Sequence, residues 1–383
     1  MEINKIMAEG IKDSRNNPTI KVSVFVGDMS DSFSVPSGAS TGIHEAHELE
    51  IDRAIKNVNE IIAPVLIGRD VSKQKEIDQA MLDLDGTYNK DNLGGNAMIG
   101  VSIACAKTAA KVLNKEVYEH LRTLIDIEVS NKNPHLFINL INGGKHAKND
   151  LAFQEYHIVP TTKNIEEAVK IGNLVQDKLE EKLGKVEIGD EGGFAPKVKD
   201  IREPLVLLTE IIKENNLKVK LSMDVAASSF YENGKYLVDG QKIDKYELME
   251  KYNSLIDEFN IFSIEDPFEE EDFNGFEKLK ETGIDVIGDD LTVTNKDLLK
   301  KGLGSITGMI VKPNQIGTLT ETLETMKLAK ENDIKLIVSH RSGETDDNFI
   351  ADLAYAFSCF GLKAGSPRKK ERMVKYQRLI DIV

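Results

Sequence analysis

Three acidic residues each follow directly on a short apolar run in the second half of the chain. Asp224 follows VKLSM, Glu265 follows IFSI and Asp289 follows DVIG. If these runs are neighbouring parallel strands, their ends meet at one edge, where three carboxylates would repel one another unless a cation neutralised them. Oxygen ligands without a nearby cysteine favour a hard divalent ion, Mg²⁺ above all. Helix capping is the alternative for each acid alone, but it accounts poorly for three in consecutive units.

A lysine follows the next apolar run, GMIV, at position 312. Beside a divalent metal and partly buried, Lys312 would have a lowered pKa, which suits a general base. Taken alone it could equally be a surface lysine. Its position directly after the strand of a metal ligand favours the role of base.

The remaining polar strand ends fit an anionic substrate. In SHRSGE, Arg341 and Ser342 offer a guanidinium and a hydroxyl to a phosphate, and Lys363 in GLKAG offers a cation to a carboxylate or an enolate oxygen. The segment GDEGGF holds Asp190 and Glu191 between glycines. It could be only a tight turn, but a general acid at a barrel rim is favoured, with Glu191 as the candidate.

Strands alternating with helices must position these residues. Apolar runs of 4–6 residues recur, each ending in a polar residue and followed by a stretch of helical character: LFINLI, QEYHIVP, VEIGDE, VKLSMD, IFSIED, DVIGDD, GMIVKP, KLIVSH and GLKAG. About eight such units predict parallel βα repeats that close into a (β/α)₈ barrel. LFINLI and QEYHIVP lie too close together for a helix between them, which predicts an antiparallel start to the barrel.

The first third of the chain has a different pattern, typical of an α+β domain. Alternating apolar residues over 20–26 predict a strand, and residues 32–35 predict its hairpin partner. Helices are predicted over 45–62 and 99–113. The expected domains are residues 1–128 (α+β) and 129–383 (barrel), and the expected fold class is α/β.

Composition limits the classes of partner. A net charge of −15 argues against broad binding to nucleic acid or anionic lipid. The basic segment PRKKER (367–372) is a possible anion patch or the solvated face of the last helix. No apolar run approaches the ~20 residues of a membrane span, and two cysteines make no disulfide framework. A cytoplasmic location is expected.

Ten motifs in order resemble those of the enolase family. They are PSGAST (36–41), DLDGT with NK (83–90), QE (154–155), GDEGGFAP (189–196), MDVAAS with FY (223–231), SIEDPF (263–268), GDDLTVTN (288–295), KPNQIGTLTET (312–322), SHRSGET (339–345) and the KAGSP region at Lys363. The resemblance spans nearly the whole chain. It implies an enolase-type (β/α)₈ barrel behind a smaller α+β domain, and the Mg²⁺-dependent reversible dehydration of 2-phosphoglycerate to phosphoenolpyruvate.

The resemblance also implies roles residue by residue. Asp224, Glu265 and Asp289 would hold one Mg²⁺, and Ser40 would help to hold a second. Lys312 would be the base and Glu191 the acid, supported by Glu155. The remaining implied site residues bind substrate or line the site: Gln154, His146, His340, Arg341, Ser342 and Lys363. The use of a Lys or His base with one or two Mg²⁺ ions is a known property of enolase-superfamily sites. A homodimer or higher homo-oligomer is expected by resemblance only.

Two lysines depart from the family pattern. Lys145 and Lys148 stand beside His146 where the family typically has small residues. They could strengthen anion attraction, alter substrate choice or point to solvent. The alternatives to a working enolase are therefore a paralogue acting on another phosphorylated or hydroxy acid, and a non-catalytic scaffold. The presence of every implied catalytic side chain argues against the scaffold.

Overall fold

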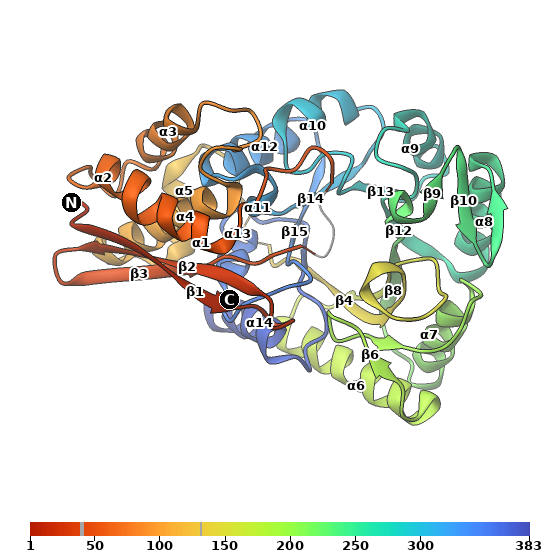
Figure 1. Cartoon of the computed structure of the whole chain (residues 1–383). Coiled ribbons are helices and arrows are strands. Elements are labelled where there is room, and N and C mark those ends of the chain that lie inside the picture. The colour runs from red at the N-terminus through yellow and green to blue at the C-terminus, as the bar shows by residue number, and fades with distance from the viewer. Residues whose placement is uncertain (39–41, 131) are drawn as a thin grey trace.

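The computed structural model describes residues 1–38, 42–130 and 132–383 (Figure 1). An antiparallel sheet opens the chain, with strands in the order β1 (Lys5–Lys12), β2 (Pro18–Val26) and β3 (Met29–Ser34). The predicted hairpin is confirmed, since β2 and β3 pair around the turn at Gly27 and Asp28. Side chains of β2 alternate between buried and partly exposed positions because one face of the sheet packs on helices.

Helices follow the sheet in the first part of the chain. Their bounds are α1 (Ile51–Lys56), a π-helical segment η1 (Asn57–Ile62), α2 (Ala63–Leu66), α3 (Gln74–Asp85), α4 (Gly95–Val112) and α5 (Val117–Leu124). Helix α4 confirms the helix expected over 99–113. The boundary expected at 128/129 falls between α5 and the next strand, and it stays a prediction.

The helix predicted over 45–62 is wrong at its start. Residues 45–50 are not helical, and the helix begins at Ile51. The backbone N–H of Ala46 donates to the carbonyl of Gln315, and that of His47 donates to the carbonyl of Asn89. Because these donors bond to other segments, they cannot bond within a helix.

Eight strands of the described chain close into a barrel. In spatial order they are β4 (His135–Asn142), β5 (Glu155–Pro160), β8 (Val219–Asp224), β12 (Ile261–Glu265), β13 (Asp285–Gly288), β14 (Gly308–Val311), β15 (Lys335–Ser339) and β16 (Gly361–Lys363), with β16 pairing back to β4. Strand β5 is antiparallel to both of its neighbours, which confirms the expected antiparallel start. The other neighbouring pairs are parallel.

The run VEIGDE is not a barrel strand, contrary to the expectation. Only Glu187–Ile188 (β6) is extended there, and both residues are exposed. Strand β6 pairs with β7 (Phe194–Ala195), which attaches to β4 at Ile141. The segment therefore forms a two-stranded flap that extends the sheet beside β4, and the loop between its strands brings Glu191 to the cavity.

Helices surround the barrel on its outside. Their bounds are α6 (Ile165–Leu183), α7 (Glu203–Glu214), α8 (Lys245–Phe259), α9 (Phe273–Lys280), α10 (Lys296–Gly302), α11 (Pro313–Ile316), α12 (Leu319–Glu331), α13 (Phe349–Ala356) and α14 (Lys370–Ile382). Short 3₁₀ turns lie at Gly144–His146 (η2) and Ala227–Phe230 (η3), and a small sheet comprises β9 (Tyr231–Glu232), β10 (Lys235–Val238) and β11 (Gln241–Ile243).

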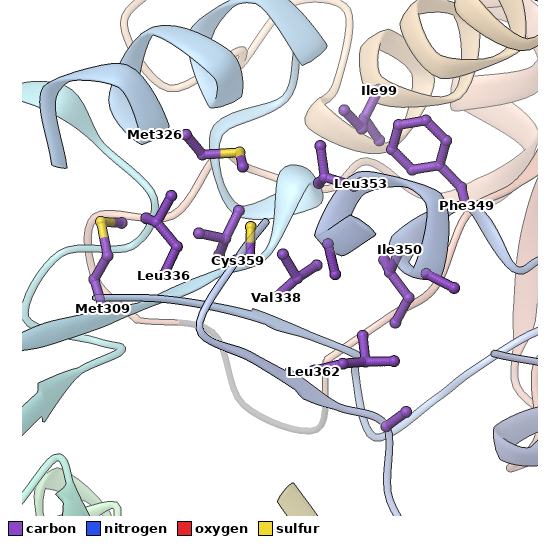
Figure 2. Packing of buried hydrophobic residues seen from close by; sticks show 14 of the residues in the cluster. Ile99, Met309, Met326, Leu336, Val338, Phe349, Ile350, Leu353, Cys359 and Leu362 are labelled. Carbon is purple, nitrogen blue, oxygen red and sulfur yellow. The ribbon is translucent and has the colours of Figure 1, made fainter. Parts of the chain in front are cut away.

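One apolar core runs from the first sheet into the barrel layers. Figure 2 shows Ile99 of α4 beside Phe349 and Leu353 of α13, with Val338 of β15 beneath them. The two parts of the chain therefore share buried apolar surface. No helix in the described part of the chain combines the length and apolar character that crossing a membrane requires.

Candidate active site

A small cavity of ≈ 40 Å³ opens at the carboxyl ends of the barrel strands. Most of the site residues expected from the sequence line it: His146, Gln154, Glu155, Glu191, Asp224, Asp289, Lys312, His340, Arg341, Ser342 and Lys363. Glu265 is buried directly beside it, and Ser40 lies outside the described residues. This is the barrel end at which active sites are built.

Strand register brings three carboxylates side by side. Glu155 is the cross-strand partner of Asp224, and Asp224 is the partner of Glu265. The ammonium of Lys363 lies among them, 2.8 Å from Asp224 Oδ2, 2.9 Å from Glu265 Oε2 and 3.4 Å from Glu155 Oε1. The amide of Gln154 also donates to Asp224 Oδ2 at 3.3 Å, so it orients a carboxylate of the cluster.

The carboxylates of this cluster interact strongly. Burial and the charge of Asp224 raise the pKa of Glu265 well above its usual range, while Lys363 acts in the opposite direction. Burial also acts to raise the pKa of Asp224, but Lys363 outweighs it and lowers the pKa of Asp224 to about 2. Lys363 therefore keeps Asp224 ionised, but its single charge does not do the same for every carboxylate of the cluster.

A second acidic group lies at the next two strand ends. Oxygens of Asp266, Asp289 and Asp290 lie within 4.8 Å of one another. Asp266 accepts the backbone N–H groups of both other residues at 2.8 Å, and the Gln315 amide donates to Asp289 Oδ1 at 2.9 Å. Burial and Asp289 raise the pKa of Asp290 to about 7.

Sequence reasoning missed Asp266 and Asp290, although each directly follows a residue that it singled out. The doubled acids in IFSIED and DVIGDD were the available signal.

Lys312 reaches this second group, with its Nζ in contact with Asp289 Oδ2. The downward shift of its pKa was expected beside a bound metal and stays a prediction, whereas the protein groups alone act differently. Burial acts to lower the pKa of Lys312, but the Asp289 carboxylate acts to raise it, and the net direction is upward.

Two more carboxylates, those of Glu155 and Glu191, line the same cavity as Lys312. His146 Nδ1 lies 3.6 Å from Glu155 Oε1 and 3.5 Å from Glu191 Oε1. Burial and the Glu191 carboxylate raise the pKa of Glu155 well above its usual range. Burial acts likewise on Glu191, but His340 and His146 outweigh it and lower its pKa. These opposite pKa shifts favour Glu155 over Glu191 as the carboxyl that carries a proton.

His340 is held in a defined orientation. Its Nε2 lies 3.2 Å from Glu191 Oε2, and its Nδ1 contacts a guanidinium nitrogen of Arg372. Because a guanidinium only donates, Nδ1 is the accepting nitrogen and the proton of the ring is on Nε2, facing Glu191. Burial lowers the pKa of His340 to about 4, so the ring is neutral near pH 7.

Arg372 corrects the interpretation of the segment PRKKER. It is neither part of an exposed anion patch nor on a solvated helix face, because it is fully buried. It donates to the carbonyls of Arg341 and Ser342 at 2.6 and 2.7 Å. Arg368 and Lys370 in the same segment are exposed and pair with acidic side chains, namely Asp177, Glu180 and Asp346, so the solvated alternative describes these two residues. A run of charged residues in the sequence does not indicate which of its members is buried.

Arg341 points into the cavity but already contacts a carboxylate. Its guanidinium donates to Glu45 at 2.9 and 3.3 Å and to Asn314 Oδ1 at 3.2 Å, and both members of the pair are buried. Burial acts against the charge of Arg341, but Glu45 raises its pKa above the usual range. Sequence reasoning missed Glu45, which lies 296 residues away along the chain.

The two lysines that depart from the family pattern lie outside the cavity. Lys145 and Lys148 flank buried His146, and both are exposed. Of the alternatives stated for them, the solvent-facing one agrees with their position.

The donor set fits a hard divalent cation. The structure places Asp224 and Glu265 around Lys363, whereas Asp289 contacts Lys312 and groups within 4.8 Å with Asp266 and Asp290. All of these acids offer oxygen atoms only, and burial together with the charge of Asp224 raises the pKa of Glu265. Oxygen-rich, acidic and nearly buried sites of this kind suit Mg²⁺.

Comparison with known proteins agrees with this geometry. Residues 3–121 match the family model of the enolase N-terminal domain, and residues 130–383 match that of the enolase C-terminal TIM barrel domain. Enolase of Methanocaldococcus jannaschii is 46% identical over 404 residues, covering 100% of this chain and 95% of that protein. Enolases of Methanopyrus kandleri and Thermococcus gammatolerans are each 43% identical, covering 99% and 100% of this chain and 95% and 94% of their own lengths. The chain belongs to the enolase family.

Proposed function

We propose that this chain catalyses the Mg²⁺-dependent, reversible dehydration of 2-phosphoglycerate to phosphoenolpyruvate. One observation carries the proposal: an amine, Lys312, and a pair of buried, coupled carboxylates, Glu155 and Glu191, line a single cavity. A base and an acid in one cavity are what removal of a proton from one carbon and of hydroxide from the next requires.

Substrate binding would use the cations of the site. Arg341 and Ser342 would bind the phosphate, and Lys363 the carboxylate. The pairing of Arg341 with Glu45 supports an exchange in which phosphate takes the place of the Glu45 carboxylate.

Asp224, Glu265 and Asp289 would hold one Mg²⁺, and Ser40 would help to hold a second. When bound, the metal supplies positive charge that stabilises the carboxylate of the substrate as it gains electron density. That two ions bind, rather than one, is a separate part of this proposal.

The proton steps are assigned to residues of the chain. Lys312 Nζ would take the proton from carbon 2, next to the carboxylate, and the electron pair left behind would form the double bond to carbon 3. The hydroxyl on carbon 3 would leave as water with a proton from the Glu155–Glu191 pair. His146 lies between the two carboxylates, and His340 orients Glu191, so both would hold this pair in place.

An absorbance assay for phosphoenolpyruvate tests the proposal. The purified chain should convert 2-phosphoglycerate in the presence of Mg²⁺ and lose this activity in the presence of a chelator. Absence of product in both conditions would refute it. The remaining enzymatic hypothesis would then be a paralogue that acts on another acid. Lys145 and Lys148 would be the first positions to replace by small residues.

Two expectations on the cellular context accompany the proposal. We expect a homodimer or higher homo-oligomer and a cytoplasmic location. Sedimentation measurements and cell fractionation would test them.

A further inference from the structure

A histidine that neither the sequence motifs nor the proposed proton steps use lies directly beneath the acid pair. His157 and Glu155 are two residues apart on β5, so both side chains project to the same face of the strand. The Nε2 of His157 lies 2.8 Å from Glu155 Oε2. Both residues are 1% exposed, so no bulk solvent competes for this hydrogen bond.

The two oxygens of Glu155 have different surroundings. Oε2 contacts His157, whereas Oε1 faces His146 at 3.6 Å and Lys363 at 3.4 Å. The hydrogen bond from below therefore leaves Oε1 as the oxygen that faces the cavity. When Glu155 carries a proton, Oε1 is the position from which that proton can reach the site.

Packing sets the position of the imidazole. Phe137, a member of the apolar cluster that fills the barrel below, contacts the ring edge to face at 6.3 Å between centroids and 80° between planes. Asn139 and Ser222 are the cross-strand partners of His157 on either side. The ring is therefore confined between the apolar cluster and Glu155.

The protonation state of the ring follows from its partners. Burial and the charge of Lys363 lower the pKa of His157 to about 3, so the ring is neutral at pH 7. Its Nδ1 has no hydrogen-bond partner among the described residues. A buried N–H without an acceptor is costlier than a buried acceptor without a donor, so the proton belongs on Nε2, where Glu155 accepts it.

We propose that His157 is a positioning residue, which donates from Nε2 to Glu155 Oε2 and thereby keeps Oε1 directed at the reacting groups. The inference rests on the proposed function, because it assigns His157 to the acid half of that reaction. It predicts that loss of the donor impairs the expulsion of hydroxide while substrate binding and proton removal by Lys312 persist.

Three substitutions separate the donor from the bulk of the ring. Met fills a similar volume but cannot donate. Gln places an amide N–H near the position of Nε2, whereas Asn places its amide near Nδ1, too far from Glu155. We expect His157→Met and His157→Asn to lower kcat about 10- to 100-fold with KM within about twofold, because the buried hydrogen bond that holds Glu155 Oε2 is lost. His157→Gln should retain most of the activity.

Exchange of the carbon 2 proton distinguishes a positioning role of His157 from a merely structural one. In D₂O, NMR follows deuterium incorporation into 2-phosphoglycerate, which requires the base but not the departure of hydroxide. His157→Met should exchange this proton at close to the wild-type rate while it forms product slowly. Equal losses of exchange and product formation, or the same activity for the Gln and Asn variants, would overturn the inference.

His120 provides a matched control. It is a second buried histidine, on α5 far along the chain from β5, and neither ring nitrogen has a hydrogen-bond partner among the described residues. His120→Met should leave kcat unchanged. Thermal unfolding of each variant shows which of them are folded, and the comparison of Gln with Asn uses only folded ones.

A spectroscopic test does not depend on activity. ¹⁵N–¹H correlation of the histidine rings at pH 7 should report a neutral His157 with its proton on Nε2, and Glu155→Leu should alter the signal. A proton on Nδ1 would refute the inference whether or not the enzyme turns over. A wild-type chain that shows the expected signal but no conversion of 2-phosphoglycerate would instead refute the proposed function alone.

Discussion

Replacement of Lys363 by Met should destabilise the protein in a way that depends on pH. Lys363 is buried, and its ammonium lies 2.8, 2.9 and 3.4 Å from Asp224, Glu265 and Glu155. At an effective dielectric constant of ~20, each of these pairs is worth about 5–6 kcal/mol before desolvation. A carboxyl that loses this partner will instead take up a proton, which costs about 4 kcal/mol at pH 7 for an ordinary pKa of ~4.3.

Proton uptake therefore limits the loss to about 4 kcal/mol at pH 7, in line with about 3–5 kcal/mol for breaking buried ion pairs. The direction in which this loss of stability changes with pH follows from the pKa shifts of the carboxyl groups. Glu155 and Glu265 already have folded-state pKa values above those of the unfolded chain, and removal of Lys363 raises them further. Groups of this kind destabilise the folded state increasingly as pH rises above the unfolded pKa. At pH 5 the loss should fall to about 1 kcal/mol.

Urea unfolding at pH 5 and pH 7, each with Mg²⁺ or a chelator, measures the effect. Mg²⁺ should recover part of the stability lost by Lys363→Met at pH 7, because it supplies charge to the same carboxylates. Lys375→Met is the control: Lys375 is also buried and pairs with Glu344 at 2.6 Å, but it does not line the cavity. A loss that is the same at both pH values, or an equal Mg²⁺ response in the control, would refute the reasoning.

Three further outcomes are expected. Lys312→Ala should lower kcat by about 10³-fold or more and abolish deuterium exchange at carbon 2, because the proposed base is lost; surviving exchange would reassign the base. Glu45→Gln should tighten the binding of phosphoenolpyruvate by about tenfold in calorimetry, because Arg341 no longer pairs with a competing carboxylate; weaker binding would contradict the exchange. Asp78→Ala should lower the free energy of unfolding by about 2–4 kcal/mol, because Asp78 is buried in α3 and accepts from Thr320 of the barrel part at 2.6 and 2.9 Å; an unchanged denaturation midpoint would exclude this link between the two parts.

Much of the architecture and most of the residues at the site were accessible from local pattern. Parallel strands bring their carboxyl ends to one rim, so a polar residue directly after an apolar run is placed by the run itself. For this reason Asp224, Asp289, Lys312, Arg341 and Lys363 could be assigned to one site before any contact was known. The run VEIGDE was misassigned because its local pattern resembles that of a strand, whereas only a flap forms there.

Contacts between distant segments were decided by the tertiary structure alone. The pair of Glu45 with Arg341 joins positions 296 residues apart, and Arg372 is buried within a run of charge that reads as surface. Residues 45–50 avoid a helix because their backbone donors bond to distant carbonyls. With the protein groups alone, the pKa of Lys312 is raised by its contact with Asp289, and this contact between two strands could not be foreseen from local pattern. The alternation of residues along a strand determines to which face of the sheet each side chain points. Closure of the barrel determines which side chains from other strands it then contacts.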